Sequence, residues 1–234
     1  NLKKALAVGA AALMLSTGYN ALNVPSAEAK VNFDLFDFEA HRGGRDARPE
    51  NTLVSFAYAM ELGVTTLEMD MQMTKDGQLV ISHNPVLNPN LTKGPDGKWV
   101  TADKYDIRTM TLAEVKQFDV GTMNPAAGGY YDGHGKTQLS VPGTKIPTLE
   151  EVFELANAYG NDKVIFNIET KSYVNPDPNA KNNADPVAFV KKVNEIVKKY
   201  GMENRVTLQS FDWRTLKEMK KLLSGHHRLE EHWE

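Results

Sequence analysis

Residues 38–85 read FEAHRGGRDARPENTLVSFAYAMELGVTTLEMDMQMTKDGQLVISHNP and contain two histidines and a Glu-x-Asp pair. Within this stretch, residues 65–73 are rich in β-branched and apolar residues, which is typical of a buried strand. Residues 51–63 carry apolar side chains at helical spacing, with Asn51 as the expected N-cap and Gly63 as the expected stop. A helix set between short strands predicts βα units and a parallel sheet.

The same alternation continues along the rest of the chain. Five strands are expected, at residues 36–40, 65–73, 78–82, 163–169 and 205–211, and further helices at 148–160, 185–201 and 212–223. From about residue 85 to 145 the chain is instead rich in Asn, Pro, Gly and Asp. A structureless loop of that length is uncommon in a compact domain. We therefore expect about five βα units and, after the third strand, an insertion with short structure of its own.

The first 29 residues have the pattern of an export signal. Lys3 and Lys4 precede an apolar run at 5–15, and Ala-Glu-Ala follows at 27–29. This order of a basic, an apolar and a small-residue segment is typical of a secretory signal peptide. The apolar run is shorter than the ~20 residues of a membrane-spanning helix. The sequence thus predicts a periplasmic or secreted protein, without stable membrane insertion after signal cleavage.

Composition narrows the classes of partner and site. The chain has no cysteine, which excludes disulfides and thiolate metal sites. Its formal net charge is −3, and charges of both signs are interspersed. This balance argues against nucleic acid as the main partner, because nucleic-acid binding relies on basic surfaces.

Polar residues that could take part in catalysis or metal binding recur at the ends of the expected strands. They are His41, Glu68, Asp70, His83, Glu169 and Lys171. Alternate strand residues share a face, so Glu68 and Asp70 point one way, while Met69, Met71 and Met73 point into the core. The carboxyl ends of parallel strands meet at one rim, where α/β proteins hold their active sites. We expect these side chains to meet there.

The residue types at this rim favour phosphate chemistry. Carboxylates without soft ligands suit a hard cation, Ca²⁺ or Mg²⁺, rather than zinc. Arg42 and Lys171 provide positive charge for an anionic substrate, and the glycines after Arg42 are expected to let the loop approach a ligand. His41 and His83 have the chemistry of a general acid and base. The residues alone predict metal-assisted cleavage of a phosphate ester.

The other histidines are weaker candidates. His134 lies in a glycine-rich part of the insertion and is expected to be solvated. His226, His227 and His232 belong to a polar tail.

Five motifs resemble those of the glycerophosphodiester phosphodiesterase family. They are HRG, PENT, LEMDMQMTKDGQLVISH, FNIETK and LQSFD, in the family's order and spacing, from about Phe36 to Leu223. The resemblance implies a (β/α)8 TIM-barrel type of fold. It also implies His41 and His83 as the acid/base pair. The metal ligands that it implies are Glu68, Asp70 and Glu169, and the residues that it implies as phosphate contacts are Arg42 and Lys171.

The activity implied by the resemblance is hydrolysis of a small-molecule glycerophosphodiester to glycerol 3-phosphate and an alcohol. The implied cofactor is a divalent cation, with Ca²⁺ expected over Mg²⁺. Exported members of the family similarly carry a signal peptide.

Two features depart from the family pattern. The usual His-Asp of the third strand is here His83-Asn84. A closed barrel also needs eight strands, and five are expected. The resemblance therefore indicates an incomplete barrel domain at 30–223, followed by an atypical tail at 224–234.

Two other interpretations stay open. A sphingomyelinase-type phospholipase D is similar in its two histidines and acidic cluster, although such toxins carry disulfides and this chain has no cysteine. The second interpretation is that the chain is an inactive, shortened secreted protein.

Overall fold

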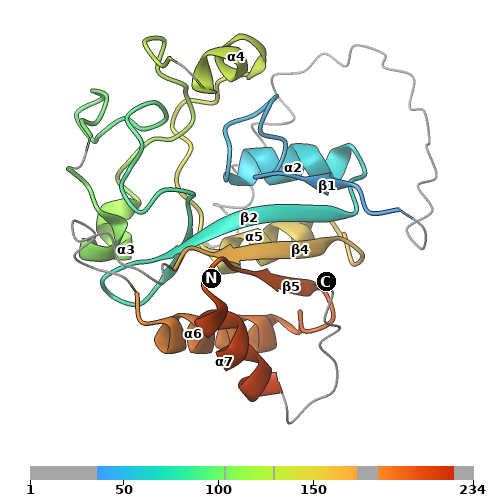
Figure 1. The fold of residues 1–234 in the computed structure, drawn as a ribbon. Helices are drawn as coiled ribbons and strands as arrows, with labels where there is room; N and C mark the ends of the chain where they lie inside the picture. Colours follow the sequence, from blue (N-terminus) through green and yellow to red (C-terminus); the bar gives the residue numbers. More distant parts are fainter. Residues whose placement is uncertain (1–35, 103, 129, 173–183, 224–234) are drawn as a thin grey trace.

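The structure, a computed structural model, describes residues 36–102, 104–128, 130–172 and 184–223. The predicted export signal at 1–29 and the predicted tail at 224–234 lie outside these residues and stay predictions. A twisted sheet forms the middle of the molecule, with helices packed against it and a separate lobe beside it (Figure 1). Within the described ranges, no helix combines the length and apolar character needed to cross a bilayer.

Four parallel strands make up the frame of the sheet. Their spatial order is β1-β2-β4-β5, with bounds Glu39–Ala40, Thr66–Met73, Ile165–Thr170 and Val206–Gln209. All three neighbouring pairs run parallel. The α/β class and the parallel sheet predicted from the sequence are confirmed.

The expectation of a fifth parallel βα unit is wrong. Strand β3, Leu79–Ile81, pairs antiparallel with β2, so that Met71 faces Ile81 and Met73 faces Leu79. The connection between the two strands is a short turn, in which Gly77 has φ 72°. A link that short joins only antiparallel neighbours, because a parallel connection needs a crossover of a dozen or more residues. Asp-Gly between two apolar segments, here Asp76-Gly77, is a typical hairpin signal.

Helices cover the apolar face of the sheet. They are α2 Leu53–Glu61, α5 Leu149–Ala158, α6 Pro186–Tyr200 and α7 Trp213–Leu223. On β2, Met69 and Met71 are fully buried in one core with Phe153 and Phe166, and Met73 packs at its edge. The Phe153 and Phe166 rings meet edge to face with centroids 4.9 Å apart. Burial of this alternating face holds the opposite face of β2 in a fixed register.

The helix ends follow the sequence signals with one correction. Pro186 begins α6, and Gly201 ends it with φ 65°. At α2, however, the N-cap is Thr52, whose hydroxyl accepts from the Ser55 N–H, and not Asn51. Threonine is a good cap, which leaves the Asn51 amide for another role.

The residues between β3 and α5 form the lobe, with short elements of their own. These are the 3₁₀ helix Ile107–Thr109, α3 Leu112–Val115 and α4 Tyr130–Thr137. Eight side chains form a second small core, among them Leu87, Ile107 and Phe118. The segment interpreted from the sequence as an insertion thus contains short elements and a small core.

Candidate active site

The polar face of the sheet gathers three carboxylates through strand register. Asp70 of β2 lies directly opposite Glu169 of β4, and Glu68 is two residues earlier on the same face of β2. All three are buried, with exposed fractions of 1% for Asp70 and 6% for the other two. One oxygen of each lies within 4.8 Å of those of the other two. The structure therefore brings these three predicted site residues together.

Glu68 and Asp70 do not lie at a strand end, contrary to expectation. Strand β2 runs on to Met73, because its last residues pair with β3 in the hairpin. The carboxyl end of β3 consequently returns to the level of Asp70, whose carbonyl accepts from the Ser82 N–H at 2.8 Å. His83 therefore reaches the site by antiparallel return rather than from a parallel strand end.

Negative charge is concentrated at this point. Burial, and then the nearby Asp70 carboxylate, raise the pKa of Glu68 to about 8, although the Arg42 backbone N–H donates to Glu68 Oε2 at 2.6 Å. Burial disfavours the ionised form of a carboxyl group, and a bound divalent cation would favour that form again. A cluster of hard carboxylate oxygens fits Ca²⁺ or Mg²⁺. These residues are therefore suited to hold such an ion.

Asp70 is fixed by contacts on both of its oxygens. Oδ2 accepts from Asn51 Nδ2 at 2.9 Å and lies 3.3 Å from Arg42 Nε. Oδ1 lies 3.1 Å from Lys171 Nζ, which is also 2.9 Å from Glu169 Oε1. Burial alone would raise the pKa of Asp70, but Lys171 and the Asn51 hydrogen bond outweigh it and lower the pKa. Asp70 is thereby kept ionised.

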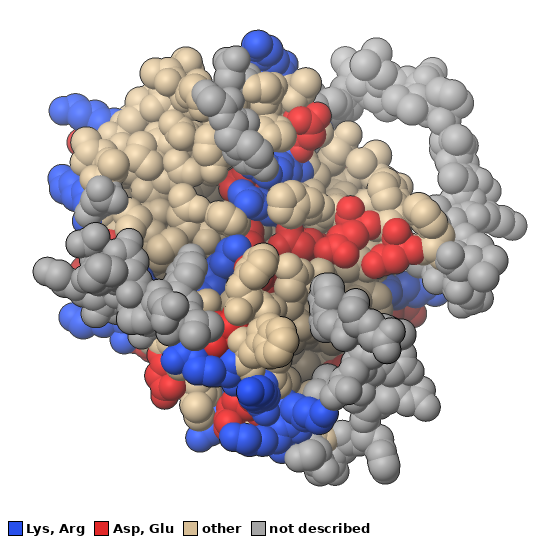
Figure 2. Space-filling view, in the orientation of Figure 1, with Lys and Arg blue, Asp and Glu red and all other residues tan. Residues whose placement is uncertain are grey.

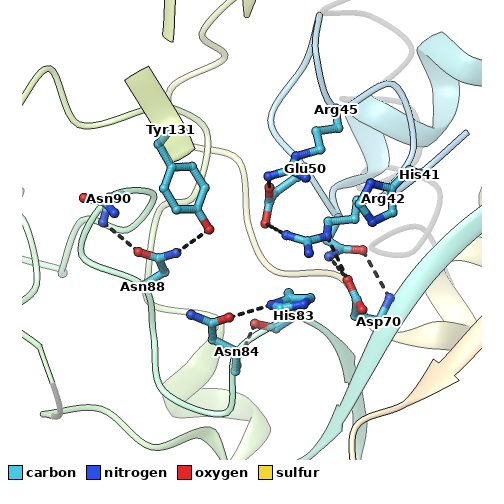
Figure 3. Close-up of polar contacts among 12 residues, drawn as sticks. His41, Arg42, Arg45, Glu50, Asp70, His83, Asn84, Asn88, Asn90 and Tyr131 are labelled. Atoms are coloured by element: carbon cyan, nitrogen blue, oxygen red, sulfur yellow. Dashed lines mark hydrogen bonds and ion pairs between the residues drawn. The ribbon is translucent and has the colours of Figure 1, made fainter. Parts of the chain in front are cut away.

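Arg42 belongs to a buried chain of charges. Its Nη1 donates to Glu50 Oε1 at 3.0 Å, and Arg45 Nη2 lies 3.0 Å from Glu50 Oε2 (Figure 3). Burial alone would lower the pKa of the Arg42 guanidinium, but Glu50 and Asp70 raise it. Glu50 thus holds two arginines side by side next to Asp70.

The glycines after Arg42 allow close packing of the loop, and their expected part in ligand approach stays a prediction. A Cβ on Gly43 would lie 2.6 Å from Ser55 Oγ, and one on Gly44 would lie 2.6 Å from Tyr58 Cδ1. Both Ser55 and Tyr58 are on α2. The loop can lie this close to the helix only without side chains, and that contact places Arg42 over the carboxylates.

Asn51 is a site residue that the sequence reasoning missed. It is buried, has φ 54°, and uses both amide atoms on Asp70, since Asn51 Oδ1 also accepts from the Asp70 N–H at 3.3 Å. The PENT motif was noticed, but an asparagine before an amphipathic segment also has the pattern of a helix cap. Only the fold shows which role it takes.

The two histidines lie on either side of Asp70 (Figure 3). His41 Nε2 is 3.9 Å from Glu68 Oε2, and its side chain is 60% exposed. Partial burial, followed by the charges of Arg42 and Arg45, lowers the pKa of His41. His83 Nδ1 lies 2.6 Å from Asn84 Oδ1. The site therefore combines the acidic cluster with two imidazoles, as the sequence predicted.

A second overlooked group supports the segment that carries Lys171. Ser172 Oγ donates to Asp212 Oδ2, and both residues are buried. Arg214 Nη2 donates to the same carboxylate at 2.7 Å. The LQSFD motif contains Asp212, but its partner could be found only from the fold. This contact ties the chain after β4 to the start of α7.

The remaining histidines lie outside this cluster. The expectation that His134 is solvated is wrong in part, because its side chain is 24% exposed and Nδ1 lies 3.0 Å from Asp46 Oδ1. His226, His227 and His232 lie outside the described residues. On one face of the molecule, acidic side chains gather across the middle with lysine and arginine side chains at one end of the band (Figure 2).

Fold and site together define an α/β protein with a cluster of carboxylates that is suited to bind a cation. Two histidines and two cationic side chains flank this cluster. The sequence profile of the glycerophosphoryl diester phosphodiesterase family matches residues 41–230. The chain belongs to that family.

Individual relatives agree with this assignment. A glycerophosphodiester phosphodiesterase of Caldanaerobacter subterraneus is 33% identical over 78% of this chain and 61% of its own length. A candidate glycerophosphoryl diester phosphodiesterase of Silicibacter pomeroyi, known as a crystal structure, is 33% identical with a TM-score of 0.71, covering 80% of this chain and 62% of that one. A phosphodiesterase of Oleispira antarctica, solved with its product sn-glycerol-3-phosphate, is 26% identical with a TM-score of 0.58, covering 82% and 64%. The chain thus spans about three fifths of the length of these relatives.

Proposed function

We propose that this protein hydrolyses a glycerophosphodiester to glycerol 3-phosphate and an alcohol, with the help of a divalent cation. The observation that carries the proposal is the cluster of Glu68, Asp70 and Glu169, whose oxygens lie within 4.8 Å of one another beside two histidines. Membership of the family supports the reaction class. The Oleispira relative, solved with glycerol 3-phosphate, supports the product.

The three carboxylates would hold the cation, which would withdraw charge from the phosphoryl oxygens as a Lewis acid. We propose calcium over magnesium, as the resemblance to exported members of the family implies. The oxygens of the three carboxylates lie within 4.8 Å of one another, and hard oxygen ligands of this kind suit either ion.

The cationic side chains have donors to spare for a phosphate. A lysine ammonium has three donors, and the contacts of Lys171 with Asp70 and Glu169 use two. An arginine has five N–H donors; Arg42 Nη1 donates to Glu50 Oε1, and Nε lies 3.3 Å from Asp70 Oδ2. We propose that the remaining donors of both side chains bind phosphate oxygens. The side chains of Arg42 and Lys171 are only 8% and 10% exposed, and their ion pairs fix their positions, which reduces the cost of ordering them on binding.

The imidazoles would carry the protons. Water attacks phosphorus and forms a new P–O bond, while the bond from phosphorus to the alcohol oxygen breaks. One imidazole accepts the proton from the water, and the other donates a proton to the departing alcohol. His41 and His83 are the candidates, because both lie beside the acidic cluster.

Release of glycerol 3-phosphate from glycerophosphocholine tests the proposal. We expect His41→Ala and His83→Ala each to lower kcat by about 10²- to 10⁴-fold, the range for a positioned acid or base. Glu169→Gln should also abolish turnover, whereas Glu203→Gln makes the same chemical change at an exposed residue and should not. Equal activity of the Glu169→Gln and Glu203→Gln proteins would contradict the proposal.

The same assay separates the two other interpretations. A sphingomyelinase-type phospholipase D would release choline from sphingomyelin faster than it hydrolyses glycerophosphocholine. An inactive family member would bind calcium in titration calorimetry and turn over neither substrate. We propose that the protein acts in the periplasm or outside the cell, as residues 1–29 predict, and fractionation of expressing cells tests this location.

A further inference from the structure

The contact between His83 and Asn84 defines which ring nitrogen of His83 carries a proton. His83 Nδ1 lies 2.6 Å from Asn84 Oδ1 (Figure 3). An amide oxygen only accepts hydrogen bonds, and each ring nitrogen of a neutral imidazole is either a donor or an acceptor. In a neutral His83 ring this contact requires Nδ1 to be the donor, which leaves the lone pair on Nε2.

The backbone around this pair is fixed from several directions. Gln72, a buried side chain of β2, donates through Nε2 to the His83 carbonyl at 3.1 Å. Ser82 Oγ donates to the Asn84 carbonyl at 3.2 Å. His83 and Asn84 also line a pocket of ≈ 40 Å³ together with Glu50 and Asn51. With the main chain held in this way, the Asn84 side chain contacts the His83 ring, its one hydrogen-bond partner within the described part of the chain.

We propose that Asn84 is a positioning residue that locks His83 in the Nδ1–H tautomer, so that Nε2 is the only ring nitrogen that exchanges a proton during the reaction. The inference rests on the proposed function for the meaning of that proton transfer. The tautomer itself is a property of the resting protein. A side chain at position 84 that accepts a hydrogen bond should retain the tautomer, and one of similar size that cannot accept should release it.

Long-range ¹⁵N–¹H NMR of ¹⁵N-histidine-labelled protein measures the tautomer directly. The His83 signals are assigned by their loss in His83→Gln. We expect the Nδ1–H form in the parent and in Asn84→Asp, whose carboxylate also accepts. Asn84→Leu should give a mixture of both tautomers. A parent protein in the Nε2–H form, or an Asn84→Leu protein with an unchanged tautomer, would overturn the proposal.

Asn90→Leu provides a matched control, because it makes the same side-chain change in the same lobe. Asn90 contacts Asn88 through its backbone N–H, which the substitution keeps. We expect its His83 signals to equal those of the parent.

Kinetics then test the consequence for the reaction. Asn84→Leu should lower kcat by about tenfold with KM unchanged, while Asn84→Asp should restore most of the kcat. An Asn84→Leu protein with altered tautomer and full kcat would show that the lock does not serve catalysis. A parent without turnover would refute the proposed function, while the tautomer measurement would still decide the structural part.

Discussion

At the scale of single residues, the proposed cation site depends on how the Asp70 side chain is held in position. Its carboxylate contacts two cations and one neutral side chain, Asn51, which also accepts from the Asp70 backbone. Groups that orient a metal ligand commonly affect metal affinity by about 10- to 100-fold. Asn51 is the informative position, because replacing it leaves the charge of the site unchanged.

Asn51→Gly should weaken calcium binding by about tenfold, the low end of the range for such supporting groups. Glycine adopts the left-handed backbone of this position, φ 54°, without strain. The substitution therefore removes the amide and little else, and titration calorimetry with calcium measures the result.

Asn51→Ala is the companion variant, because alanine loses the amide and must also adopt positive φ at a cost of about 1–2 kcal/mol. It should match Asn51→Gly in calcium affinity and be the less stable of the two. Parental calcium affinity in Asn51→Gly would remove Asn51 from the site.

At the scale of elements, a loop and a helix position the site together. Gly43 and Gly63 both need positive φ, 74° and 77°, but only Gly43 lies against α2, where a Cβ would be 2.6 Å from Ser55 Oγ. The loop that follows β1 reaches the carboxylates because this contact is close.

Gly43→Ala should therefore lower both the unfolding free energy and turnover, since the displaced loop carries Arg42. Gly63→Ala should cost about 1–2 kcal/mol of stability through backbone strain alone and keep kcat. Urea unfolding and the phosphodiesterase assay check the pair. Equal kcat losses in the two variants would contradict a role of the close contact in placing Arg42.

The start of α7 also contributes to stability, through the contacts of Asp212. Hydrogen bonds from Arg214, and then from Ser172, lower the pKa of Asp212 from 3.8 to about 2. Because the folded-state value is the lower one, the group stabilises the protein above pH 3.8, and this stabilisation is lost as pH falls towards 2.

Asp212→Asn should lower the unfolding free energy by about 1–2 kcal/mol at pH 7, a figure reduced for the exposure of Arg214. The difference between parent and variant should stay constant from pH 7 to about pH 5 in urea titrations and shrink as pH falls through 3.8 towards 2, because the Asp212 carboxyl is then protonated first in the unfolded parent. A difference independent of pH would mean that the charge of Asp212 does not contribute.

At the scale of the whole molecule, the sequence predicted the strands, the main helices, the separate insertion and the converging site residues. It missed the direction of β3, because periodicity identifies a strand but not its partner. It also missed Asn51 and the contact between Ser172 and Asp212, residues 40 positions apart. Such roles depend on which segments the fold brings together, and residue type alone does not encode them.

The edges of the sheet are where this chain is expected to associate with other copies. In the described ranges β1 pairs only with β2, and β5 pairs only with β4. Phe38 lies beside the first edge and is 45% exposed, while Phe211 and Trp213 follow β5 and are 81% and 69% exposed. Unpaired strand edges and exposed apolar side chains promote association.

Residues 30–234 expressed alone should therefore form oligomers or aggregate, and unfold over a broad temperature range. Size-exclusion chromatography with light scattering and thermal unfolding measure this. Phe211→Ser combined with Trp213→Ser should reduce the association. A monomer at all concentrations with one cooperative transition would contradict the expectation.

The central claim is that Glu68, Asp70 and Glu169 hold a divalent cation that the reaction requires. The most direct measurement is the rate of glycerol 3-phosphate release from glycerophosphocholine before chelation, in excess chelator, and after calcium is restored. We expect chelation to abolish turnover and calcium to restore it more fully than magnesium does. Undiminished turnover in excess chelator would show that the reaction needs no divalent cation.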